Sequence, residues 1–148
     1  MADGPAPLDL GFRAYRLAPS NFRPWDGTIP EGDIRRQLEL AAEHVRPGAD
    51  DGALLAELLL KTGFELTTPV AIVEIAGQRV YDVGDGTLLI CLDRQITLGL
   101  VEGMAARRPA EILCLDAGFP DDQTKVNAGQ IIASHARDAA APIVFKVV

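Results

Sequence analysis

The sequence predicts an α/β fold whose C-terminal part is a Rossmann-like βαβαβ unit. Two short apolar runs, Thr87–Leu92 and Glu111–Leu115, are each followed by an aspartate, Asp93 and Asp116, so that both segments end in Cys-Leu-Asp. Such runs are typical of parallel strands covered on both faces. A helix is expected between them over Ile96–Arg107, a second over about Gln123–Asp138, and a last strand over Ile143–Val147. Strands that alternate with helices of this length favour a parallel sheet with right-handed crossovers.

The middle of the chain predicts a β-meander that leads into this unit. Val70–Ile75 and Gln78–Val83 have the residue types of strands, and Gly77 between them indicates a hairpin turn. Residues 84–86, Gly-Asp-Gly, form a turn into the next strand and precede no helix, which argues against a phosphate-binding loop. The meander is expected to complete a mixed sheet.

The N-terminal third predicts a strand and a helical hairpin. Phe12–Leu17 alternates bulky and charged side chains, which indicates a half-buried strand at an edge. Glu31–Arg46 and Asp51–Lys61 have apolar residues at helical spacing, and Gly63 is expected to end the second helix as a left-handed cap. We expect one α/β domain over residues 1–148, in which residues 1–9 are frayed or form a linker.

The charge and the apolar runs of the chain indicate which kinds of partner and which cellular compartment to expect. The chain carries 21 acids against 14 Lys and Arg, a formal net charge of −7, which argues against strong DNA binding by this chain alone. This net charge is still compatible with a domain that supports a neighbouring DNA-binding domain. The N-terminus lacks a basic and then apolar run, and the apolar runs are too short to span a membrane, so we expect a cytoplasmic protein.

The thiols and imidazoles give little indication of a metal site. Cys91 and Cys114 occupy equivalent places in two predicted buried strands, so they are expected to be apolar core thiols, with a disulfide as the alternative. His44 and His135 lie on predicted helices far from either cysteine in sequence and without the spacing of zinc ligands.

The sharpest candidates for chemistry are Asp93 and Asp116. Both follow predicted parallel strands, at the sheet edge where α/β proteins bind ligands, and together they could share a metal or a proton. The alternative is that each carboxylate binds free amides of its own loop and helix start, and this alternative is favoured. Lys125 and Asn127 add polar groups near the same edge, and they equally fit an ordinary helix N-terminus.

Several segments in order resemble the C-terminal part of type III restriction-modification DNA methyltransferases. The resemblance covers nearly the whole chain, in an order and approximate spacing that agree with the family. The matching segments are Gly11–Leu17, Ser20–Trp25, Leu55–Gly63, Leu66–Pro69, Leu89–Asp93, Cys114–Phe119 and Lys125–Ala128.

The resemblance implies a domain of an adenine-N6 methyltransferase that uses S-adenosylmethionine and works with a restriction helicase-nuclease subunit. The family's Asp-Pro-Pro-Tyr-type motif and Gly-rich cofactor motif lie upstream of the matched region, and this sequence contains neither. No catalytic, cofactor or metal residue can therefore be assigned, and this chain is expected to hold no cofactor itself. The implied role is non-catalytic assembly, with the methyltransferase catalytic domain, a second methyltransferase copy or the restriction subunit as partner, and contact with DNA only through the assembled complex.

The contact surface for such partners is expected at apolar residues in loops. Phe22 and Trp25 lie in a Pro-rich N-terminal loop, and Phe119 follows the second Cys-Leu-Asp. Arg13, Arg16 and Arg23 could add a small patch for an anionic partner, or they could form a solvated strand face. Two other functions stay open, namely a small metal-dependent enzyme that uses Asp93 and Asp116, and a protein-binding adaptor unrelated to methylation.

Overall fold

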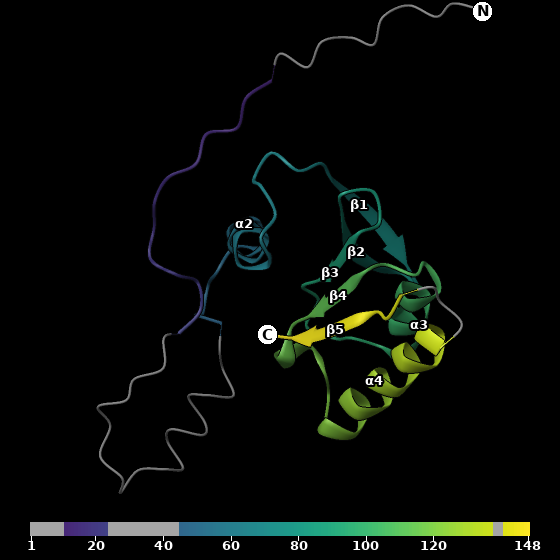
Figure 1. Cartoon of the computed structure of the whole chain (residues 1–148). Helices are drawn as coiled ribbons and strands as arrows, with labels where there is room; N and C mark the ends of the chain where they lie inside the picture. Colours follow the sequence, from purple (N-terminus) through teal and green to yellow (C-terminus); the bar gives the residue numbers. More distant parts are fainter. Residues whose placement is uncertain (1–10, 24–44, 138–140) are drawn as a thin grey trace, which may run out of the picture.

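A computed structural model describes residues 11–23, 45–137 and 141–148 of the chain, and Figure 1 shows its arrangement. Five strands form one mixed sheet in the order β1-β2-β3-β4-β5. The first three strands pair antiparallel, whereas β3, β4 and β5 pair parallel. The strand bounds are β1 Val70–Ile75, β2 Gln78–Val83, β3 Leu88–Cys91, β4 Glu111–Cys114 and β5 Val144–Val147. The predicted α/β fold, with a meander that feeds a parallel βαβαβ unit, is confirmed.

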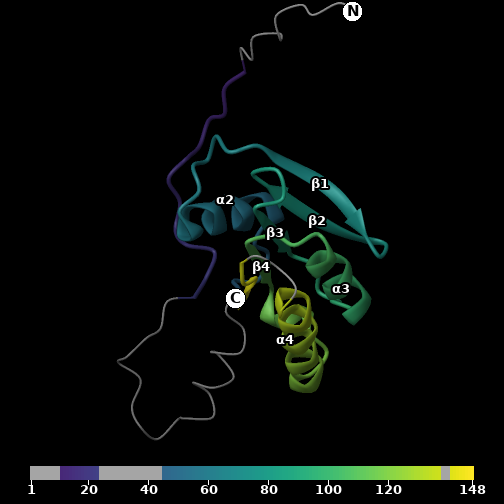
Figure 2. The same ribbon diagram turned by 45° about the vertical axis from the view of Figure 1, so that its right-hand side comes forward.

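Helices cover both faces of the sheet. Helix α2 packs on one face, and helices α3 and α4 pack side by side on the other, as Figures 1 and 2 show. The bounds are α2 Asp51–Thr62, α3 Leu98–Ala106 and α4 Asp122–Arg137, with a short 3-10 turn, η2, over Asp116–Gly118. No helix in the described ranges is both long and apolar enough to cross a membrane.

The ends of α2 follow from one residue at each terminus. Asp50 caps the N-terminus, where its carboxylate accepts hydrogen bonds from the amides of Gly52 and Ala53. Gly63 ends the helix in the left-handed region at φ 84°, as the sequence predicts. Both ends of the helix that precedes the meander are therefore set by local sequence.

The central strand β3 explains why its sequence is apolar throughout. Leu89 and Cys91 point into the core beneath α3 and α4, whereas Leu88 and Ile90 point into the core beneath α2. All four side chains are fully buried. A strand between two helical layers has no solvent-facing side, so it has no polar positions.

Two predictions for the N-terminal third need correction or cannot be followed. Phe12–Leu17 forms no strand, and residues 11–20 are all exposed and lack regular structure. They pair with no strand among the described residues, and Arg13 and Tyr15 bind the Leu66 carbonyl instead. The predicted helix over 31–46 lies mostly outside the described residues; its last part, at Val45, forms an isolated bridge with Phe22 rather than a helix.

Candidate functional site: an extended segment docked on helix α2

Asp93 and Asp116 lie on adjacent loops at the carboxyl edge of the parallel strands. Cys91 and Cys114 are register partners, so the two aspartates occupy equivalent positions two residues further on. The loops are packed together, because the Ile96 amide donates a hydrogen bond to the Gly118 carbonyl at 2.8 Å. The sequence therefore placed both residues at the correct edge of the sheet.

The two carboxylates nevertheless have separate partners. Asp93 accepts a hydrogen bond from the Gln95 amide at 3.2 Å, within its own turn. Asp116 forms an ion pair with Lys125, whose ammonium also lies 3.3 Å from the Asp122 carboxylate. The hydrogen bond to Asp116 raises the pKa of Lys125. The capping alternative thus describes Asp93, and Asp116 belongs to an ion-pair cluster at the start of α4.

Other groups near this edge do not complete a metal site. Asn127 accepts a hydrogen bond from the Gln123 side chain at 3.0 Å and takes no part in the Asp116 cluster. In the described part of the chain, no three His, Cys, Asp or Glu side chains are grouped so that they could hold a metal ion. The interpretation as a metal-dependent enzyme gains no support from this arrangement.

The cysteines are core thiols. Cys91 and Cys114 are free and fully buried in neighbouring parallel strands. Burial raises the pKa of both thiols, which keeps them protonated and unreactive at neutral pH. His135 lies half-buried on α4 with its Nδ1 atom 3.1 Å from the Ile131 carbonyl, and His44 lies outside the described residues.

The predicted contact residues differ in their surroundings. Phe119 is only 8% exposed and packs edge-to-face on Phe145 at 6.4 Å between ring centroids, so its assignment to a partner surface is wrong. Its loop turns back over the sheet and buries the ring in the core beneath α3 and α4. Trp25 lies outside the described residues, and Phe22 is half-buried beneath the Lys61 ammonium, 3.9 Å from its ring centroid.

Phe22 belongs to a segment that is fixed on α2 by Glu57. The Glu57 carboxylate accepts hydrogen bonds from Ser20 Oγ at 2.5 Å, from the Asn21 backbone amide at 2.7 Å and from Asn21 Nδ2 at 3.1 Å. Lys61, one turn further along α2, adds an ion pair at 3.0 Å. Four donors therefore converge on one side chain that is only 17% exposed.

This set of donors determines the protonation of Glu57. Burial opposes the charged form, but the hydrogen bonds from Ser20, the Asn21 amide, Lys61 and the Asn21 side chain outweigh it and lower the pKa of Glu57 to about 2. Glu57 is thus a fixed anion at neutral pH. Its negative charge is what holds residues 20–22 against the helix.

The same segment is held at two further places. The Asn21 carbonyl accepts a hydrogen bond from the Arg46 amide at 2.8 Å, next to the isolated bridge between Phe22 and Val45. Nearer the N-terminus, Arg13 Nη1 and Tyr15 OH donate to the Leu66 carbonyl at 3.3 and 3.1 Å. We call residues 11–23 the strap; Figures 1 and 2 show it as an open trace beside α2.

The strap keeps two large apolar side chains in solvent. Phe12 is 91% exposed and Leu17 is 100% exposed. Phe12 directly precedes Arg13, which binds the Leu66 carbonyl. Leu17 lies between Tyr15, which binds the same carbonyl, and Ser20, which binds Glu57. The exposed apolar groups are therefore held at one place on the molecule. A fixed segment that exposes apolar groups has the character of a contact surface for another macromolecule.

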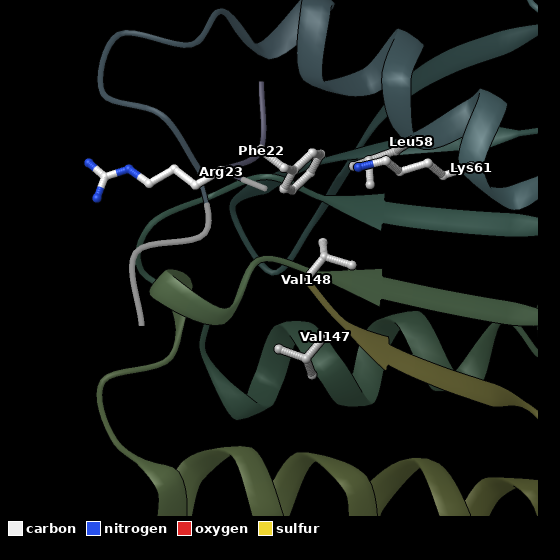
Figure 3. Close-up of a pocket in the computed structure, with 6 residues that line it drawn as sticks. All are labelled: Phe22, Arg23, Leu58, Lys61, Val147 and Val148. Carbon is white, nitrogen blue, oxygen red and sulfur yellow. The ribbon is translucent and has the colours of Figure 1, made fainter. Parts of the chain in front are cut away.

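A pocket of about 300 Å³ lies where the strap crosses the end of β5. Figure 3 shows the Phe22 ring and the Lys61 side chain on its upper side, Val147 and Val148 on its lower side, and Arg23 directed away from it. Its lining is mostly apolar. Among the residues that the structure describes, the side chains on the α2 face therefore leave this space open.

Sequence reasoning missed the residues that build this site. Glu57 was part of a predicted helix with no assigned role, and Phe12 and Leu17 were assigned to a half-buried strand. A usable signal was present in the charges, because residues 11–23 contain three arginines and no acid in a chain of net charge −7.

A comparison with protein-family models and with curated proteins finds no match to this chain.

Proposed function

We propose that this chain is a non-catalytic assembly domain of a type III DNA adenine methyltransferase. The observation that supports this proposal is the strap, which is fixed on α2 by Glu57 and holds Phe12 and Leu17 in solvent. A flexible tail could bury such residues only at a large entropic cost, whereas a fixed segment has lost much of that freedom before a partner binds. The chain would provide a prepared contact surface and would take no part in methyl transfer.

The partner in this proposal is the catalytic domain of the methyltransferase. That domain would bind S-adenosylmethionine and carry out the chemistry, and DNA would be contacted only by the assembled complex. A second methyltransferase copy and the restriction subunit are the other partners that the resemblance implies. All three are proteins, which agrees with a role in assembly.

The test is binding to the catalytic region of a type III adenine methyltransferase that lacks its own C-terminal domain. The two proteins would be mixed, and the mass of the complex would be followed by light scattering across a dilution series. We expect a complex that the double variant Phe12→Ser/Leu17→Ser weakens at least about tenfold, because burying each side chain on binding contributes about 1.5–3 kcal/mol.

A control pair removes exposed apolar side chains outside the strap. Ile72 on β1 and Val126 on α4 are both exposed, so Ile72→Ser/Val126→Ser should leave the affinity unchanged. The proposal fails if the catalytic region does not bind, or if the control pair weakens binding as much as the strap pair. Binding only to proteins unrelated to methylation would favour the adaptor alternative.

A further inference from the structure

We infer that the partner surface covered by the strap is acidic, with apolar depressions that receive Phe12 and Leu17. This inference rests on the proposed function and adds the chemistry of the partner. The strap contains three of the chain's 14 Lys and Arg and none of its 21 acids. It is therefore a cationic segment on an otherwise acidic molecule, and a complementary partner surface carries negative charge.

The arginines of the strap are not all used within the chain. Arg13 donates to the Leu66 carbonyl, a neutral acceptor that leaves its positive charge without a counterion there. Arg16 is exposed and has neither an ion pair nor a hydrogen bond to any described residue. Arg16 precedes Leu17, so a free cation and a fully exposed apolar side chain stand next to each other.

The strap already recognises a carboxylate within its own molecule. Its residues Ser20 and Asn21 supply three of the four donors that surround Glu57. That contact uses the C-terminal half of the strap and leaves Phe12, Arg16 and Leu17 exposed in the other half. Carboxylates on a partner would extend the same kind of recognition to Arg16.

Duplex DNA is the other polyanion that a cationic segment could meet, and it fits less well. The strap belongs to a chain of net charge −7, which repels the dense, continuous charge of a phosphate backbone more strongly than it repels a local acidic patch. Phe12 and Leu17 also require apolar depressions, which a protein surface offers. The observations therefore favour an acidic protein surface.

The experiment compares three forms of the full chain in binding to the catalytic region described above. They are the unchanged chain, Arg16→Glu, and Arg137→Glu as a control, since Arg137 is an exposed arginine on α4 at the opposite face of the sheet. Binding is measured by titration at low and high salt, and a fluorescent duplex DNA is titrated in parallel. We expect Arg16→Glu to weaken binding to the catalytic region about tenfold at low salt, less at high salt, and Arg137→Glu to have no effect.

The outcomes separate this inference from the proposed function. Tight binding that Arg16→Glu leaves unchanged would overturn the acidic partner surface while the assembly role stands. Duplex DNA that binds the chain and loses affinity with Arg16→Glu would also overturn it. If the catalytic region binds no form of the chain, both the proposed function and this inference fail.

Discussion

The two faces of the sheet are completed in different ways. On one face, α3 and α4 pack against each other and against β1–β5 in a continuous apolar core that includes Leu100, Met104, Ala128 and Ile132. On the other face a single described helix, α2, covers the strands, and the strap is fixed beside it largely by polar contacts. The first face is a closed interior beneath two helices, whereas the strap beside the second face holds Phe12 and Leu17 almost entirely in solvent, so the second is the face that we propose for a partner.

The largest expected change in stability comes from shortening one buried leucine on each face of the sheet. Leu100 on α3 and Leu58 on α2 are both buried, but Leu58 also lines the pocket beneath the strap. Leu100→Ala leaves a cavity in a filled core and should lower the free energy of unfolding by about 3–5 kcal/mol, whereas Leu58→Ala should cost about 2–3 kcal/mol because fewer packing contacts are lost. Urea unfolding followed by circular dichroism measures both. Equal costs, or a larger cost for Leu58→Ala, would show that the two faces are packed alike.

A smaller effect concerns the loops at the carboxyl edge of the sheet. A Cβ atom at Gly118 would lie 2.5 Å from the Asp93 carbonyl oxygen and 2.6 Å from Ile96 Cδ1, so Gly118→Ala should destabilise the fold by about 1–3 kcal/mol. The control is Gly129→Ala on α4, where no atom lies within 4 Å of the added Cβ. That change should stabilise the helix by about 0.5–1 kcal/mol. Thermal unfolding of both variants measures these changes in stability. A Gly118→Ala variant that is as stable as the unchanged chain would mean that these loops do not pack tightly.

The smallest expected effect on stability concerns Glu57. Glu57→Gln removes the charge that holds Ser20, Asn21 and Lys61, and should weaken docking of the strap by about 1–2 kcal/mol. Trypsin would then cleave after Arg13 and Arg16 faster than in the unchanged chain. Glu74→Gln, at an exposed position on β1, is the control that should leave the cleavage rate unchanged.

The same carboxylate predicts how docking of the strap depends on pH. The pKa of Glu57 is lowered from 4.5 to about 2, so the folded chain favours the charged form. Its contribution is complete above pH 4.5 and is lost as the pH falls towards 2. Carbon NMR of the Glu57 carboxyl should give a midpoint near 2, and a midpoint near 4.5 would contradict the contacts with Ser20 and Asn21.

Much of the fold could be predicted from the sequence because its signals are local. The apolar runs that become β3 and β4, the helical spacing between them and the Gly63 cap each depend on a few neighbouring residues, and each is confirmed. The meander over Val70–Val83 follows from strand residue types on both sides of one glycine turn.

The candidate site could be predicted only in part because it depends on contacts between distant residues. The alternation in Phe12–Leu17 suggested a strand, but no strand edge pairs with it and its side chains bind Leu66 instead. Phe119 looked like an exposed loop residue, and nothing in its neighbours indicated that the loop turns back onto Phe145. Glu57 acquires its role from Ser20 and Asn21, which lie 36–37 residues earlier in the chain.

Hydrogen exchange with and without the catalytic region of a type III adenine methyltransferase tests the difference between the two faces most directly. We expect slower exchange in residues 11–23 and in α2 when the complex forms, with α3 and α4 unchanged. Slower exchange confined to α3 and α4 would contradict it, because the closed face would then be the one that meets the partner.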